Sequence, residues 1–119
     1  MTLRIGEPAR EELDVPECMR LLGTATLGRL GYTQAALPAI QPVTYTVSDG
    51  SVVMPAVSGS PAVAAVHGAI VVLTVDSFGA SPSDGWVVTV VGPTRVSEGC
   101  VLLEPGLVSG WRRSLGGEP

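Results

Sequence analysis

The feature that most constrains the fold is a succession of short segments with β-type patterning, separated by glycine, proline and Asp-Gly turns. Alternate residues of the segment 38–47 fall on two sides, as expected of a half-buried strand. One side carries Ala39, Gln41, Val43, Tyr45 and Val47, and the other carries Ile40, Thr44 and Thr46. Because Asp-Gly tolerates positive φ, Asp49-Gly50 predicts a tight hairpin turn after this strand. Packed strands, and not a helical bundle, must therefore form most of the core.

Further strands are expected on both sides of this hairpin. They cover residues 24–32, 51–57, 69–76 and 86–97, with a turn at 33–37. Pro42 indicates an edge or a bulge in its strand, since proline cannot donate to a ladder. The β-branched run 69–76 predicts a strand that is buried on both faces. Gly92-Pro93 predicts a bulge or bend within the long strand 86–97.

Two short helices are expected, and at most one more at the C-terminus. Asp14 is a candidate N-cap with Glu17 at the capping-box spacing, and Gly23 is expected to end this helix in the left-handed conformation. A second short helix is predicted over 61–67, with Ser60 as its N-cap and Gly68 after its end. Residues 104–119 are rich in glycine and proline, so we expect at most a short helix around Trp111, which contacts a partner subunit or covers the barrel end.

The fold class is therefore mainly β, a small barrel of about six mostly antiparallel strands with two or three short helices. The length of 119 residues predicts one domain, with 1–12 and 105–119 peripheral or partly flexible.

Charge and composition exclude several functions. The net charge is −4, and the seven basic residues are scattered arginines, so a nucleic-acid footprint is not expected. No apolar run approaches the ~20 residues of a membrane span, and the N-terminus does not resemble a secretory signal. One histidine and two distant cysteines, Cys18 and Cys100, are too few for a protein-built zinc site. We expect reduced thiols in a cytoplasmic protein with no metal.

Several short motifs occur in a specific order. They are Leu13-Asp14 to Leu21-Leu22, Leu27-Gly28-Arg29-Leu30, Pro42-Val43-Thr44-Tyr45, Asp49-Gly50, Gly59-Ser60, Val75-Asp76 and Gly85-Trp86-Val87-Val88 with Gly92. In this order the chain resembles the flavin-binding split-barrel family typified by pyridoxamine 5'-phosphate oxidase, above all its small bacterial members. The resemblance implies a split barrel that forms a homodimer, with FMN in a cleft between the subunits and its ring system along residues 42–45. The residues it implies for ligand binding are Gln41, Val43, Thr44, Tyr45, Ser58, Ser60 and Trp86.

The basic residues that hold the flavin phosphate in this family are missing. By resemblance they would stand at Pro55, Pro61 and Val91, and residues 30–94 contain no Arg or Lys at all. Each charge-assisted hydrogen bond to a phosphate contributes roughly 1.5–3 kcal/mol. Losing two or three weakens FMN binding by several powers of ten, so tight FMN binding by the family's usual route is not expected.

Individual polar residues leave alternatives open. His67 is either a general base or haem ligand, or a polar residue at the exposed end of a helix. Asp76 and Asp84 are either an acid–base pair or a strand cap and a loop charge. Arg29 either binds an anion or pairs with a carboxylate, and Tyr45 and Trp86 either stack on a ligand or fill the core.

Two functions remain open at this point, and no catalytic residue can be named. In the first, the interface cleft is repurposed for a mostly apolar metabolite without tight FMN, as a binding protein or as a cyclase or isomerase that works by positioning. In the second, the chain is a flavin-dependent oxidoreductase with an altered phosphate site or a different flavin.

Overall fold

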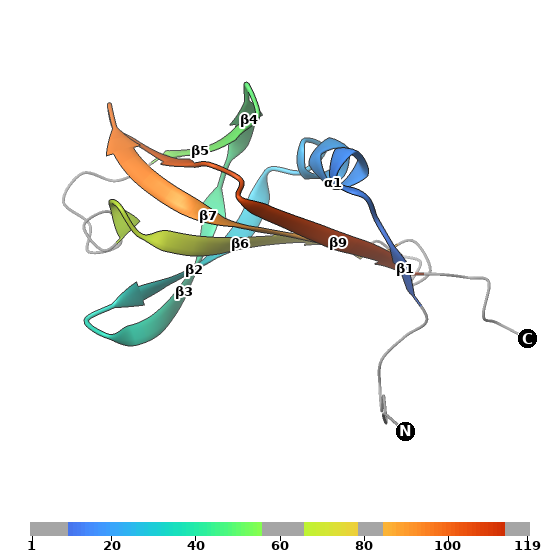
Figure 1. Cartoon of the computed structure of the whole chain (residues 1–119), viewed down its shortest axis with the longest axis horizontal. Coiled ribbons are helices and arrows are strands. Elements are labelled where there is room, and N and C mark those ends of the chain that lie inside the picture. Colours follow the sequence, from blue (N-terminus) through green and yellow to red (C-terminus); the bar gives the residue numbers. More distant parts are fainter. Residues whose placement is uncertain (1–9, 56–65, 79–84, 114–119) are drawn as a thin grey trace, which may run out of the picture.

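The computed structural model describes residues 10–55, 66–78 and 85–113. Its elements form one antiparallel sheet system that curls around the core, with a single helix among the described residues (Figure 1). In chain order they are β1 (Arg10–Glu12), α1 (Val15–Leu22), β2 (Leu27–Gln34), β3 (Leu37–Thr44), β4 (Thr46–Ser48), β5 (Ser51–Pro55), β6 (Ile70–Ser77), β7 (Trp86–Ser97), β8 (Cys100–Leu103) and β9 (Leu107–Arg113).

The sheet follows the order β3-β2-β6-β7-β8-β5-β4. Its two ends, β3 and β4, are halves of one extended segment interrupted at Tyr45, so six strands make up this path. The first half, β3, pairs with β2, and the second half, β4, pairs with β5. This segment therefore crosses from one side of the barrel to the other. The prediction of a mainly β split barrel with about six antiparallel strands is therefore confirmed.

The long strand β7 joins the two parts of the barrel. Its first part pairs with β6 and β9, and from Thr94 onward it pairs with β8. Gly92 lies at this change, where a Cβ atom would stand 1.8 Å from the backbone oxygen of Glu104. The expected interruption is thus a close approach of backbone within a continuous strand, which only glycine permits.

Helix α1 packs across the inner side of β7 and β9. The Asp14 carboxylate accepts a hydrogen bond from the Glu17 backbone N–H at 2.9 Å, as the capping-box spacing predicts. Gly23 does not adopt the expected left-handed conformation, since its φ is −72°. The helix ends instead with Thr24, whose backbone N–H and hydroxyl both donate to the Leu21 carbonyl.

The core lies between α1 and the inner faces of the strands. Thr94 is a buried polar residue here, and its hydroxyl donates to the carbonyls of Val66 and Ala69. The buried hydrophobic residues are Cys18, Leu21, Leu22, Leu30, Tyr45, Val52, Met54, Val66, Val71, Leu73, Val75, Trp86, Val88, Val90, Val101 and Leu103.

Three expectations about the strands were wrong. Strand β6 is buried on one face only, since Ile70 is 65% exposed whereas Leu73 is fully buried. The described part of the C-terminal region, up to Arg113, is not helical, because β9 occupies it and pairs with β7 from Leu107 to Arg112. The polar N-terminal lead-in contributes β1, which pairs with β9.

The hairpin between β2 and β3 is tighter than predicted. Its strands extend to Gln34 and Leu37, and only Ala35 and Ala36 form the turn, with φ of 52° and 66°. Positive φ is strained for alanine, so the sequence carries no turn signal at these two positions. The second predicted helix, 61–67, lies almost wholly outside the described residues.

Candidate functional site

One face of the sheet is directed away from the core and carries unusual apolar exposure. We call it the outer face; it consists of the outward-pointing residues of β3, β2, β6, β7 and β9. Ile40 is 73% exposed, Ile70 65% and Leu107 66%. Contiguous apolar surface of this kind marks a binding or association site in most proteins.

A pocket of about 440 Å³ opens on this face and on the strand ends beside it. We call it the Arg29 pocket. It combines backbone from the start of β2 with side chains of β3 and β6, which the register of Arg29 with Pro42 and Thr74 brings together. Its lining residues are Ala25, Thr26, Leu27, Gly28, Arg29, Pro42, Thr74, Asp76 and Ser77.

The charged groups of this pocket neutralise each other. Arg29 Nη1 lies 3.6 Å from Asp76 Oδ2, and the two side chains are 61% and 37% exposed. Such an exposed pair contributes little to stability. Arg29 is the one cation among the pocket's lining residues, and it is paired with Asp76. The alternative in which Arg29 pairs with a carboxylate is therefore confirmed.

A second, shallower hollow of about 390 Å³ lies further along the outer face. Gly31 forms part of it, and a Cβ there would approach Val72 Cγ1 to 2.8 Å. Val91, where the family resemblance implies an arginine, borders this hollow beside apolar neighbours. The lining residues are Gly31, Tyr32, Thr33, Pro38, Ala39, Ile40, Ile70, Val71, Val72 and Val91.

The residues implied for ligand binding on β3 alternate between the two faces. Gln41 and Val43 are half-buried and point inward, whereas Thr44 is exposed on the outer face. The Tyr32 hydroxyl donates to Gln41 Oε1 at 3.0 Å, so Gln41 has a partner within the chain. Pro42, between them, is the β3 residue that lines the Arg29 pocket.

The two aromatic candidates lie in the core. Tyr45 is 2% exposed, and its hydroxyl donates to the Leu22 carbonyl at 2.6 Å. Burial raises the pKa of Tyr45 to about 12. Trp86 is 8% exposed and belongs to the same core. Of the two alternatives for these side chains, the structure favours core packing.

The other candidates are spread over the molecule. His67 is exposed, and its Nδ1 accepts a hydrogen bond from the Val96 backbone N–H at 3.0 Å, which ties it to β7 far from the Arg29 pocket. Ser58, Ser60 and Asp84 lie outside the described residues. Thr74 and Ser77 line the pocket but carried no sequence signal.

A charged cluster fastens α1 to β9 without forming a site. Glu17 accepts hydrogen bonds from Arg20 at 2.7 Å and from Arg112 at 2.8 Å. The hydrogen bonds from Arg20 and then Arg112 lower the pKa of Glu17 to about 2. Beneath them, burial raises the pKa of the free Cys18 thiol. These groups hold the helix in place.

Metal and membrane features are limited in the described part of the chain. The described residues contain no group of three or more His, Cys, Asp or Glu that could hold a metal ion. No described helix is long and apolar enough to cross a membrane.

The Arg29 pocket offers an FMN phosphate a single cation, and that cation has a carboxylate partner. A phosphate near −2 charge requires arginine or lysine donors free to engage it. Arg29 shares its charge with Asp76, 3.6 Å away, and residues 30–94 supply no other basic side chain. Pro55, one of the positions where a cation is missing, is exposed at the end of β5.

Known proteins with similar sequence and structure identify the family. The profile of the pyridoxamine 5'-phosphate oxidase family matches residues 14–99, more than half of the chain. The uncharacterized protein Rv0080 of Mycobacterium tuberculosis is 40% identical over 100 residues, which cover 77% of this chain and 66% of that protein. The chain thus spans just under two thirds of the length of this relative.

Solved structures agree in fold. The FAD binding protein from Mycobacterium smegmatis superposes with a TM-score of 0.80 at 27% identity, covering 89% of this chain and all of that one. An FAD-binding protein from Mesorhizobium loti has a TM-score of 0.77 at 18% identity and covers 91% of this chain and 99% of its own. A putative pyridoxamine 5'-phosphate oxidase from Corynebacterium glutamicum has a TM-score of 0.76 at 17% identity, with coverage of 97% and 100%. The matched profile and the shared split-barrel fold show that this chain belongs to the pyridoxamine 5'-phosphate oxidase family.

Proposed function

We propose that the chain is a cytoplasmic small-molecule-binding protein whose Arg29 pocket takes a planar, mostly uncharged ligand and does not hold FMN tightly. The observation that carries this proposal is the pairing of Arg29 with Asp76 at 3.6 Å in a stretch of sequence without any other cation. Leu27 and Pro42 form an apolar rim of the pocket, and a planar ring can pack against it without needing a charged protein group. The free cysteines Cys18 and Cys100 support a reducing compartment.

A second copy of the chain completes the site in this proposal. The outer face, on which the Arg29 pocket opens, carries exposed Ile40, Ile70 and Leu107, and Ile40 and Ile70 line the second hollow further along it. In a two-fold dimer the same patch meets itself, so a patch with strong net charge would repel its copy. Here the charges of Arg29 and Asp76 cancel, which suits association of two identical faces.

Any chemistry in this cleft rests on shape and positioning. Asp76 is engaged by Arg29, and His67 lies elsewhere, so neither is a free general base beside the pocket. A cleft that holds one ligand conformation can lower a barrier by roughly 7–11 kcal/mol through positioning alone. Cyclisation and isomerisation are the reaction classes that match such a cleft.

The second candidate is a flavin-dependent oxidoreductase that binds FAD through phosphate contacts outside the Arg29 pocket. It is favoured by the likeness to the FAD binding protein from Mycobacterium smegmatis, at 27% identity and a TM-score of 0.80. The two candidates differ in whether the protein must recognise a phosphate group of its ligand. The first needs no phosphate recognition, whereas the second needs a cationic site elsewhere on the chain.

Freeing Arg29 tests the first candidate. In Asp76→Asn the guanidinium loses its carboxylate partner and becomes available to a phosphate. We expect FMN affinity to rise about tenfold, while riboflavin, which lacks the phosphate, binds as it does to the unmodified protein. Fluorescence titration measures both dissociation constants.

Asp49→Asn is the matched control for this experiment. It removes the same charge at the exposed β4–β5 turn, where φ is 50° and asparagine is well tolerated. Its FMN and riboflavin affinities should not change. An equal gain in FMN affinity in both variants would reflect net charge alone, and no gain in a folded Asp76→Asn would reject the role given to the ion pair.

A further inference from the structure

The polar wall of the Arg29 pocket consists of three side chains from two neighbouring strands. Arg29 on β2 and Thr74 on β6 are direct partners in the β2–β6 ladder. Asp76 lies two residues further along β6, so it is on the same face of the sheet as Thr74. All three residues line the pocket. The wall therefore presents cationic donors, a hydroxyl group and an anionic acceptor next to one another.

The ion pair in this wall keeps much of its hydrogen-bonding capacity. Arg29 Nη1 and Asp76 Oδ2 lie 3.6 Å apart, which is longer than a hydrogen bond. The two side chains are 61% and 37% exposed, so solvent or a ligand reaches both. A guanidinium group carries several N–H donors, and a carboxylate carries several lone pairs. Both groups can therefore bind a ligand while they remain each other's counter-ion.

The paired charges determine which kind of polar group binds best. An anion that approaches Arg29 also meets the Asp76 carboxylate, and a cation that approaches Asp76 also meets the guanidinium, so each is repelled by one member of the pair. A neutral group avoids this repulsion. It uses both members if it presents a hydrogen-bond acceptor and an N–H donor side by side. The edge of a cyclic amide or imide has this arrangement, since a carbonyl stands next to a ring N–H.

We propose that the Arg29 pocket recognises the lactam or imide edge of a planar heterocycle. Arg29 donates to a ring carbonyl, and Asp76 accepts from the adjacent ring N–H. This inference rests on the proposed function, because it names the class of planar ligand that the same pocket takes. Hydrogen bonds to charged side chains are stronger than those between neutral groups. The pair therefore sets specificity, while the apolar rim at Leu27 and Pro42 supplies contact with the face of the ring.

The bicyclic imide quinazolinedione and its N,N-dimethyl derivative are the probes. Both are neutral planar rings with the same two carbonyls, but methylation replaces both ring N–H groups. A site that hydrogen-bonds a ligand N–H rejects the analogue that lacks it, since the acceptor is left unpaired. Calorimetric titration of the unmodified protein should show the unmethylated ring binding about tenfold or more tightly than the methylated one.

Two substitutions of Asp76 test which group accepts from the ring N–H. Asp76→Ala should abolish the preference for the unmethylated ring. Asp76→Asn removes the same charge but keeps an acceptor oxygen, so it should retain part of the preference. The ratio of the two dissociation constants is the readout, because a purely structural change would weaken both rings alike. Melting temperatures show that each variant is folded.

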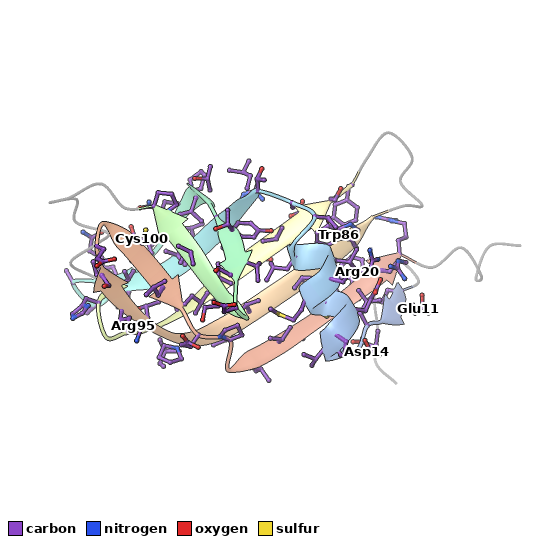
Figure 2. All side chains as sticks on the ribbon, turned by 90° about the horizontal axis from the view of Figure 1, so that it is seen from above. Glu11, Asp14, Arg20, Trp86, Arg95 and Cys100 are labelled. Atoms are coloured by element: carbon purple, nitrogen blue, oxygen red, sulfur yellow. The ribbon has the colours of Figure 1, made fainter. Side chains whose placement is uncertain are left out.

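Arg29→Leu tests the donor, with Arg95→Leu as the matched control. Arg29→Leu should weaken binding of the unmethylated ring about tenfold, because the ring carbonyl loses its donor. Arg95 is also an exposed arginine but is remote from the pocket. Ser77, which lines the pocket, pairs with Trp86, and Trp86 and Arg95 lie toward opposite ends of the molecule (Figure 2). Arg95→Leu should therefore leave the affinity unchanged.

The possible failures of this inference and of the proposed function are distinguishable. Equal binding of the two rings would mean that the pocket takes planar ligands without recognising their edge, which overturns the inference and leaves the proposed function standing. A preference that persists in full in Asp76→Ala would likewise overturn the role given to this carboxylate. No binding of either ring or of riboflavin would overturn the inference together with the proposed function.

Discussion

Replacing Gly92 by alanine is expected to lower the free energy of unfolding by about 3 kcal/mol. The added Cβ would stand 1.8 Å from the Glu104 backbone oxygen and 3.0 Å from the Gly106 backbone nitrogen. Both neighbours are main-chain atoms of the corner between β8 and β9. That corner is fixed to β7, because Glu104 and Gly106 donate backbone hydrogen bonds to the carbonyls of Pro93 and Val91. Neither side can move without breaking the join between the two parts of the barrel.

Urea unfolding at fixed protein concentration measures this loss, with Gly23→Ala as the control. Gly23 has a helical φ of −72°, and the nearest atom to an added Cβ lies 3.5 Å away. Its substitution should change stability by less than about 0.5 kcal/mol. If Gly92→Ala were as stable as Gly23→Ala, β7 would not pass this close to the β8–β9 corner.

Replacing Ile70 by glutamate is expected to weaken self-association about a hundredfold or more. In the proposed dimer this side chain is covered by the second copy, and an unpaired charge buried there is strongly unfavourable. Within a single chain Ile70 is 65% exposed, so the substitution leaves the core intact. Sedimentation equilibrium across a concentration series measures the change.

Val15→Glu is the control for this experiment. Val15 is an exposed apolar residue of α1, at 51%, and α1 packs on the inner side of β9 and not on the outer face. It should dimerise like the unmodified chain. A dimer that survives in Ile70→Glu, or an unmodified chain that is monomeric at all concentrations, would contradict the assignment of the outer face.

The barrel could be predicted from the sequence because its strongest signals are local. The Asp49-Gly50 turn, with φ of 50° and 79°, and the alternation along residues 38–47 both occur as expected. The ends of the chain were mispredicted because β1 and β9 are stabilised by each other and by β7, contacts between residues far apart in sequence. Glycine and proline around 104–110 indicated irregular structure, whereas Gly106 and Gly110 occupy crowded positions against β7.

The site was only partly predictable, because it too depends on contacts between residues far apart in sequence. The absence of cations between residues 30 and 94 is visible in the sequence, and so is Arg29 as a group that either binds an anion or forms an ion pair. That Asp76 is the partner follows from the β2–β6 register. The exposure of Ile70 could not be predicted, because a β-branched run has the same pattern whether one or both of its faces are covered by the same chain.

The most direct test of the proposed function is the ratio of the dissociation constants of FMN and riboflavin for the unmodified protein, measured by fluorescence titration. The two ligands share the ring system and differ in the phosphate. With Arg29 held by Asp76, the two constants should agree within a factor of about three, which is under 1 kcal/mol. FMN binding a hundredfold or more tighter than riboflavin, by contrast, would mean that this pocket recognises phosphate and that the proposed function is wrong.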